Sequence, residues 1–138
     1  MVEQLIGLIP AAGKGLRLYP YTDTTPKPLL YVDGVPIMLR NIALMRDQLG
    51  IRKIYIIVGY KKDEIIEVFG DGKSLGVEII YIETHAVEKG LADGMLLAKD
   101  LIKSAFCVIL GDEVYHDSNH HELLNLALED FDAICAIK

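Results

Sequence analysis

The sequence predicts an α/β fold with a mainly parallel sheet and helices on both faces of that sheet. Two observations lead to this fold class. Short apolar runs rich in Ile and Val alternate with longer segments whose apolar residues have helical spacing. Most of the short runs are continuously apolar, which is typical of parallel strands buried on both faces. The alternation therefore predicts right-handed βαβ crossovers within one sheet.

Five segments have the composition of strands. They are 4–9, 53–59, 77–82, 105–111 and 132–137. Four segments between them have the apolar spacing of helices, and these are 36–49, 63–69, 91–102 and 120–128. Gly50 and Gly70 follow the first two helical segments, where glycine favours a helix end because it readily adopts the left-handed conformation. The predicted order of elements is βαβαβαβαβ.

The length and hydropathy limit the organisation of the chain. Its 138 residues correspond to one domain that can bury a real core, so we expect a single domain over residues 1–138. The sequence stops one residue after the last predicted strand, and we therefore expect it to be truncated at its C-terminal side. No apolar run approaches the roughly 20 residues that span a bilayer, and the start lacks the cationic lead of a signal peptide. We expect a cytoplasmic protein that does not contact membranes.

The net charge argues against a nucleic-acid partner, and the surroundings of the two cysteines argue against a metal-binding or nucleophilic role. The formal net charge is −6 at pH 7, which argues against a nucleic-acid partner because such binding relies on a cationic surface. A few local cations can still hold a small anion. Cys107 and Cys135 each lie in an apolar run, which predicts buried, reduced thiols rather than metal ligands or nucleophiles.

Three loops follow predicted strands and are the places to look for a site. In an open parallel sheet, ligands bind outside the carboxyl ends of the strands. The loops at these ends are 10–28, 83–90 and 111–119. Each of them contains glycine together with charged residues.

The first loop predicts an anion site. Gly13 and Gly15 allow the backbone to approach a ligand closely with its N–H groups turned inward. Arg17 and Lys27 add fixed positive charge. A proline on each side of Lys27 restricts the backbone there, so this lysine lies on a stiff segment.

Two common nucleotide motifs do not describe this loop. Lys14 is followed by Gly15 rather than by Ser or Thr, which excludes a Walker loop. Leu18 stands where the third glycine of the dinucleotide fingerprint belongs. On the glycines alone, an ordinary connection with incidental surface cations is an equal alternative, whereas the whole stretch favours the anion site.

The third loop predicts a metal ligand. Asp112 and Glu113 follow a buried strand, and an aspartate at this position suits Mg²⁺, which takes one or two protein carboxylates and completes its shell with water and substrate phosphates. The alternative for Asp112 is a residue that caps a turn. His120 and His121 are adjacent on a predicted helix start and point in different directions, so we interpret them as a solvated helix entry.

The second loop carries a weaker signal. Gly90 places a bare backbone N–H near whatever binds over the sheet. Glu83, Thr84 and His85 can contact the edge of a base, but each is equally an ordinary residue at the end of a strand. Both interpretations stay open from the sequence.

The stretch "PAAGKGLRLYPYTDTTPKPLL" resembles the signature of the sugar-phosphate nucleotidyltransferases, the nucleoside-diphosphate-sugar pyrophosphorylases that include glucose-1-phosphate thymidylyl- and uridylyltransferases. The resemblance continues through "KGLADGMLLAKDLI" and "VILGDEVY", so it covers nearly the whole chain. It implies a Rossmann-like three-layer α/β/α fold. It also implies an Mg²⁺-dependent reaction in which the phosphate of a sugar 1-phosphate attacks the α-phosphorus of a nucleoside triphosphate and expels pyrophosphate.

The resemblance also implies roles for individual residues. The implied nucleotide-binding residues are Ala11, Ala12, Gly13, Gly15, Arg17, Lys27 and Gly90. Arg17 would neutralise the leaving pyrophosphate and Lys27 would hold phosphate oxygens, so these two are the implied catalytic residues. Asp112 would bind Mg²⁺. The implied partners are a nucleoside triphosphate and a sugar 1-phosphate, and oligomerisation is left open.

Two departures from the family pattern keep alternatives open. The Gln that many uridine- and thymidine-binding members carry about five residues before the loop glycine is absent, and His85 stands at that spacing, so the base is undetermined. Family members also continue past residue 138 and there supply a second metal-binding Asp and most of the sugar pocket. The alternatives are a cytidylyltransferase for a phosphorylated alcohol such as phosphocholine, and a non-catalytic nucleotide-binding module.

Overall fold

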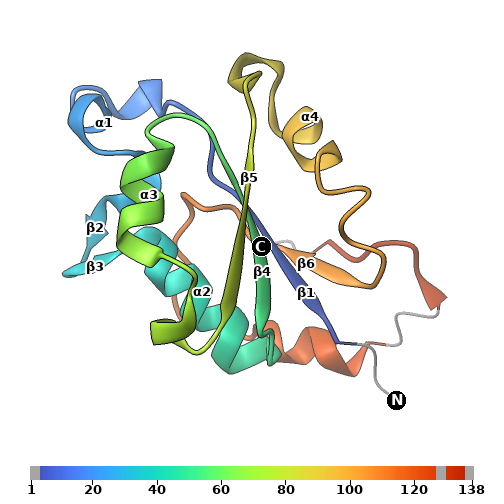
Figure 1. The fold of residues 1–138 in the computed structure, drawn as a ribbon. Coiled ribbons are helices and arrows are strands. Elements are labelled where there is room, and N and C mark those ends of the chain that lie inside the picture. Colours follow the sequence, from blue (N-terminus) through green and yellow to red (C-terminus); the bar gives the residue numbers. More distant parts are fainter. Residues whose placement is uncertain (1–3, 127–129, 136–138) are drawn as a thin grey trace.

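A parallel sheet forms the centre of the molecule (Figure 1). The computed structural model describes residues 4–126 and 130–135. The sheet has four strands in the order β5-β4-β1-β6, and each neighbouring pair is parallel. The strands are β1 (Ile6–Pro10), β4 (Lys53–Val58), β5 (Glu78–Glu83) and β6 (Phe106–Val108). The predicted parallel sheet is confirmed.

Both faces of this sheet are buried. In β4, Ile54 and Ile56 pack into one apolar cluster, whereas Tyr55 and Ile57 pack into a second cluster on the opposite face. Successive side chains of a strand point to opposite faces, so a strand covered on both sides needs apolar residues at every position. The run "KIYIIV" satisfies this requirement.

Helices cover the two faces and complete three layers (Figure 1). Helices α2 (Ile37–Leu49) and α3 (Lys62–Phe69) contribute to the first cluster, in which Met38, Ile42 and Met45 are fully buried. The segment around α4 (Leu91–Leu96) covers the other face, where Met95 and Ala98 pack in the second cluster. The predicted α/β/α architecture with helices on both faces is therefore confirmed.

The remaining elements are short. They are the 3₁₀ helices η1 (Leu16–Leu18), η2 (Lys27–Leu29), η3 (Lys73–Leu75), η4 (Val87–Lys89) and η5 (His120–Asn125), helix α1 (Tyr21–Thr24), and strands β2 (Tyr31–Val32) and β3 (Val35–Pro36). Strands β2 and β3 form an antiparallel hairpin whose turn residues, Asp33 and Gly34, both have positive φ. This hairpin was not predicted, because strands of two residues are too short to show an alternating pattern.

Four predicted elements differ in the structure. The strand predicted over 105–111 is shorter and covers Phe106–Val108. The helix predicted over 91–102 ends at Leu96 and continues as turns, and the helix predicted over 120–128 is a 3₁₀ helix over 120–125, with its last two residues outside the described part. The strand predicted over 132–137 was wrong for residues 132–135, which pair with no strand among the described residues, and residues 136–137 lie outside them. An apolar run becomes a buried strand only beside a partner, and Cys135 in this run is exposed rather than buried.

None of the helices in the described part of the chain has the length and hydropathy needed to cross a membrane.

Candidate functional site

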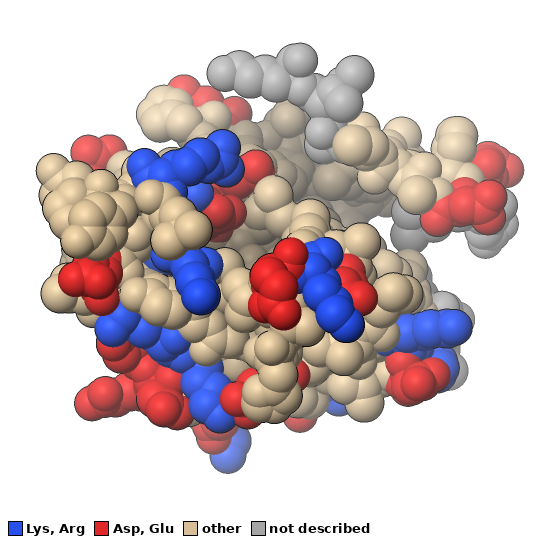
Figure 2. Space-filling view, turned by 90° about the horizontal axis from the view of Figure 1, so that it is seen from above, with Lys and Arg blue, Asp and Glu red and all other residues tan. Residues whose placement is uncertain are grey.

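The three predicted loops meet at one pocket. The pocket has a volume of about 500 Å³ and lies where β1, β5 and β6 end, so it occupies the carboxyl edge of the sheet. Seen from above in Figure 2, this edge is hollowed, and Lys and Arg side chains lie beside the hollow. The lining residues are Pro10, Ala11, Gly13, Lys14, Gly15, Leu16, Arg17, Leu18, Lys27, Pro28, Val87, Glu88 and Asp112.

Most of the residues predicted for the site line this pocket. They are Ala11, Gly13, Gly15, Arg17, Lys27 and Asp112. Ala12 and Gly90 do not line it. The carbonyl of Ala12 accepts a hydrogen bond from the Tyr60 N–H at 3.1 Å, so Ala12 connects the first loop to the end of β4. Gly90 has φ of 92° and joins η4 to α4 beyond the lining residues.

Seven of the lining residues were not predicted as ligand contacts. They are Pro10, Lys14, Leu16, Leu18, Pro28, Val87 and Glu88. The position of Lys14 between two glycines was a usable signal, because a cation inside a glycine-rich turn lies close to any anion that the turn holds. Val87 and Glu88 belong to the predicted loop 83–90, but no motif distinguishes them from their neighbours. Their place in the pocket follows from the η4 turn.

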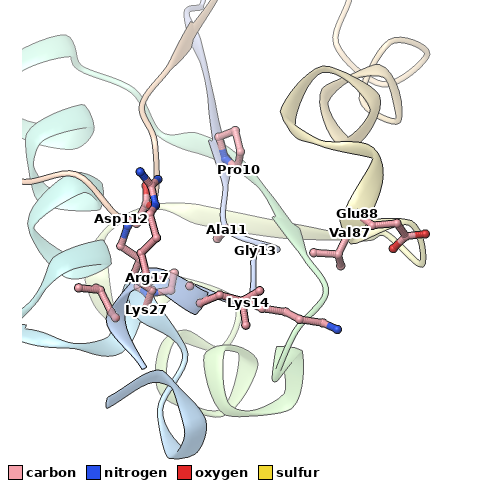
Figure 3. Close-up of a pocket in the computed structure, with 13 residues that line it drawn as sticks. Pro10, Ala11, Gly13, Lys14, Arg17, Lys27, Val87, Glu88 and Asp112 are labelled. Atoms are coloured by element: carbon pink, nitrogen blue, oxygen red, sulfur yellow. Dashed lines mark hydrogen bonds and ion pairs between the residues drawn. The ribbon is translucent and has the colours of Figure 1, made fainter. Parts of the chain in front are cut away.

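An ion pair lies at one side of the pocket. Lys27 Nζ is 2.7 Å from Asp112 Oδ2, and the two side chains are 23% and 39% exposed. Figure 3 shows Arg17, Lys27 and Asp112 gathered on one side, and Val87 and Glu88 on the opposite side. Two cations beside one carboxylate give this side an excess of positive charge, which favours a polyanionic ligand.

The glycine loop holds its shape through a left-handed residue and a buried threonine. Gly15 has φ of 65° and ψ of 37°, and its carbonyl accepts hydrogen bonds from the Leu18 N–H at 2.9 Å and the Thr22 hydroxyl at 2.8 Å. A Cβ at Gly15 would lie 2.9 Å from Thr22 Cγ2, so the close approach requires glycine. A Cβ at Gly13 would meet no atom within 4 Å.

Helix α2 and Gly111 position Asp112. A Cβ at Gly111 would lie 3.0 Å from the Pro10 carbonyl oxygen, so glycine lets the third loop pass closely beside the first. The buried side chain of Asn41 donates hydrogen bonds to the carbonyls of Leu110 and Glu113, at 3.0 and 3.1 Å. A buried polar residue on an apolar helix face was the available signal for this contact.

Asp112 and Glu113 have different surroundings. The Glu113 carboxylate accepts a hydrogen bond from the Tyr115 hydroxyl at 2.7 Å, and burial together with this carboxylate raises the pKa of Tyr115. Asp112 lines the pocket. Among residues 4–126 and 130–135, no three His, Cys, Asp or Glu side chains gather closely enough to hold a metal ion by themselves. Any metal here would take Asp112 and complete its shell from a ligand or water.

The residues at the end of β5 have structural partners. Lys62 Nζ lies 2.6 Å from the Glu83 carboxylate, and this hydrogen bond holds the pKa of Glu83 below its ordinary value. Thr84 is buried, and its hydroxyl oxygen accepts a hydrogen bond from the Ala86 N–H at 3.2 Å. None of Glu83, Thr84 and His85 lines the pocket, so the interpretation as ordinary strand-end residues is favoured over base contacts.

The family described as nucleotidyl transferase matches residues 6–137. The chain belongs to this family. The pocket lies within the matched residues, so all three loops that form it are family segments.

Two curated relatives show how much of a longer protein the chain corresponds to. The bifunctional protein GlmU of Methanococcus maripaludis strain S2 is 40% identical over 120 residues, which are 86% of this chain and 27% of GlmU. The UTP–glucose-1-phosphate uridylyltransferase AglF of Haloferax volcanii is 41% identical over 106 residues, which are 77% of this chain and 42% of AglF. The chain therefore spans less than half the length of either relative.

Solved structures agree with this family assignment. A Bacillus anthracis protein described as a glucose-1-phosphate thymidylyltransferase has a TM-score of 0.79 and 30% identity, over 88% of this chain and 49% of that protein. The CTP:phosphocholine cytidylyltransferase of Streptococcus pneumoniae has a TM-score of 0.67 and 29% identity, over 80% of this chain and 46% of the enzyme.

Proposed function

We propose that the chain forms the nucleotide-binding part of an enzyme that condenses a nucleoside triphosphate with a sugar 1-phosphate and releases pyrophosphate. The observation that carries this proposal is the pocket side on which Arg17 and Lys27 lie beside Asp112, next to the bare backbone of Gly13. Such a set of groups suits a triphosphate better than a neutral ligand. The similarity to AglF, a glucose-1-phosphate uridylyltransferase, supports the sugar 1-phosphate as the second substrate.

The proposed reaction needs charge and orientation rather than a covalent nucleophile. An oxygen of the sugar phosphate forms a bond to the α-phosphorus, and the bond from that phosphorus to the bridging oxygen breaks. Pyrophosphate leaves with the bonding electron pair. Arg17 donates hydrogen bonds to the leaving group and stabilises its growing charge, while Lys27 holds phosphate oxygens and fixes the direction of attack.

The pocket fits Mg²⁺ as the metal of this reaction. Asp112 would supply one hard oxygen ligand and triphosphate oxygens would supply others, which is the ligand set that Mg²⁺ commonly uses with nucleotides. Bound Mg²⁺ offsets the negative charge of the phosphates. Lys27 lies 2.7 Å from Asp112, so its ammonium also stands close to the phosphates that this metal would bind.

A cytidylyltransferase acting on a phosphorylated alcohol is the second candidate. The similarity to the phosphocholine enzyme of Streptococcus pneumoniae favours it, and the phosphate side of the pocket suits either acceptor class. The higher TM-score of the thymidylyltransferase neighbour and the identity to AglF support the sugar 1-phosphate as the first candidate. A nucleotide-binding module without catalysis is the third candidate.

A thermal-shift panel tests the nucleotide proposal. ATP, CTP, GTP, UTP and dTTP are each added with and without Mg²⁺ to the wild-type chain and to Asp112→Asn. We expect at least one triphosphate to raise the melting temperature of the wild type, because a ligand at a hundredfold excess over its Kd stabilises the native state by about 2.7 kcal/mol. Asp112→Asn should lose the Mg²⁺-dependent part of the shift. No response of the wild type to any triphosphate would contradict the proposal.

Pyrophosphate release separates the three candidates. The triphosphate that binds is mixed with Mg²⁺ and either glucose 1-phosphate or phosphocholine. Release with glucose 1-phosphate alone supports the sugar 1-phosphate proposal, and release with phosphocholine alone supports the cytidylyltransferase. Binding without release from either acceptor favours the non-catalytic module.

A further inference from the structure

Tyr60 contacts both ends of the glycine loop. Its backbone N–H donates a hydrogen bond to the Ala12 carbonyl at 3.1 Å, just before the glycines. Its side-chain hydroxyl donates to the Thr22 carbonyl at 2.8 Å, after the loop. The nine residues between these two contacts, 13–21, include six that line the pocket. One residue at the end of β4 therefore joins the two ends of the segment that forms much of the pocket.

A further hydrogen bond connects Thr22, the second partner of Tyr60, to the middle of the loop. Thr22 is only 2% exposed, and its hydroxyl donates to the Gly15 carbonyl at 2.8 Å. Tyr60 thus fixes the backbone of Thr22, and Thr22 fixes Gly15 at the centre of the loop. The Lys61 ammonium lies 5.6 Å from the centre of the Tyr60 ring and adds a contact on the aromatic side.

We propose that Tyr60 is a positioning residue that clamps the glycine loop in its binding shape before the ligand arrives. That the ligand of this loop is a triphosphate rests on the proposed function. Tyr60 does not line the pocket, so it acts through Thr22 and the backbone. A loop that is ordered during folding need not be ordered again on binding, and this preorganisation increases affinity.

A matched pair of tyrosine variants tests the clamp. Tyr60→Phe removes the hydroxyl that donates to Thr22. Tyr81→Phe removes an equivalent hydroxyl, which donates to the Gly70 carbonyl at 2.7 Å between β5 and the end of α3. Each variant removes one hydroxyl that donates to a backbone carbonyl and keeps its ring, and the Tyr60 hydroxyl also lies 3.3 Å from the Asp23 carbonyl oxygen. Thr22→Val and Thr22→Ser form a second pair, in which only serine retains the hydroxyl.

The first measurement is amide hydrogen exchange without nucleotide. The N–H groups of Leu18 and Tyr19 bond within the loop, to the carbonyls of Gly15 and Leu16. We expect Tyr60→Phe to accelerate exchange at these two amides severalfold, and Tyr81→Phe to leave them unchanged. Equal effects of the two tyrosine variants would overturn the clamp. This result does not depend on any nucleotide, so it separates the clamp from the proposed function.

The second measurement is the affinity for the best triphosphate of the panel. We expect Tyr60→Phe to weaken binding about threefold to tenfold, as the loss of one hydrogen bond implies, with Tyr81→Phe unchanged. Thr22→Val should weaken binding similarly, and Thr22→Ser should restore it. Unchanged affinity in Tyr60→Phe would overturn the clamp, whereas a wild-type chain that binds no triphosphate would overturn the proposed function.

Discussion

The two sides of the pocket are held in place differently. We call the side that bears Arg17, Lys27 and Asp112 the cationic wall, and the side that bears Val87 and Glu88 the η4 wall. The cationic wall is tied by contacts between residues far apart in the chain. They are the hydrogen bond from Tyr60 to Thr22, the ion pair between Lys27 and Asp112, and the bonds from Asn41 to the third loop.

The η4 wall depends mainly on local contacts. The Ala86 N–H bonds to the Thr84 hydroxyl oxygen, and the Lys89 N–H bonds to the Ala86 carbonyl at 3.0 Å. Val87 also packs near Gly59, which follows β4, because a Cβ at Gly59 would lie 2.8 Å from Val87 Cγ2. We therefore expect the η4 wall to change shape at less cost than the cationic wall.

A fixed wall and a more adaptable wall would suit the two parts of a nucleotide, the triphosphate and the base. The triphosphate is the same in every nucleoside triphosphate, so a wall that binds it gains from being fixed. The bases differ in shape and in hydrogen-bonding groups, so the part of a site that faces the base sets the selectivity. We infer that the cationic wall faces the phosphates and the η4 wall faces the base. The following variants test this division.

The largest effect is expected from Arg17→Ala on the cationic wall. A hydrogen bond to a charged group contributes about 1.5–3 kcal/mol, so the variant should lose at least tenfold in the rate of pyrophosphate release. The loss should be similar for every triphosphate that the wild type uses, because the contact is made to the shared phosphates. Steady-state kinetics with each triphosphate measures it.

Arg52→Ala is the matched control for this loss of charge. Arg52 precedes β4 at the amino edge of the sheet, and its guanidinium donates to the Arg46 carbonyl at 2.9 Å. We expect this variant to keep the rate of pyrophosphate release even where it lowers stability. Full activity and normal triphosphate binding in Arg17→Ala would show that the role given to Arg17 is wrong.

Gly13 and Gly15 of the glycine loop should respond differently to alanine substitution. Gly15→Ala places a Cβ in the left-handed conformation and against Thr22, and we expect it to lower the free energy of unfolding by about 1–2 kcal/mol. Gly13→Ala should leave that free energy within about 0.5 kcal/mol, because its Cβ meets open space. Urea unfolding measures both values.

The same two variants differ in what they do to the pocket. The methyl group of Gly13→Ala enters the space where the backbone would approach the phosphates, so triphosphate affinity should fall although the fold is intact. Equal stability losses in the two variants would contradict the assignment of Gly15 to folding and of Gly13 to ligand approach.

The sheet and the cationic wall were predictable because their signals are local in the sequence. The run "KIYIIV" shows burial on both faces, and the glycines, Arg17 and Lys27 lie within one stretch of chain. The rule that ligands bind at carboxyl ends of parallel strands selected the loops that contain Lys27 and Asp112. The structure then brings these two residues together, although they are 85 positions apart.

The η4 wall was not predictable in this way, and neither were the residues whose side chains hold the loops of the pocket in place. Glu88 lines the pocket because of a single turn of 3₁₀ helix, and no residue pattern distinguishes it from exposed neighbours. The contacts of Tyr60 and Asn41 run from side chains to backbone carbonyls, which are present at every residue. Asn41 on an apolar helix face signals a buried hydrogen bond, but the sequence does not show which carbonyl accepts it. The run 132–137 has the apolar composition of a strand, but a strand also needs a partner edge.

The smallest effect is expected from Glu88→Gln on the η4 wall. A carboxylate only accepts hydrogen bonds, whereas an amide of the same shape also donates them. If Glu88 faces the base, its substitution should change the relative affinities of the five triphosphates by about twofold to threefold, in a direction that depends on the base. Glu67→Gln removes the same charge from the exposed face of α3, outside the pocket lining, and controls for net charge. A uniform gain in affinity for all five triphosphates would place Glu88 near the phosphates instead. That result would contradict the inference that the η4 wall faces the base.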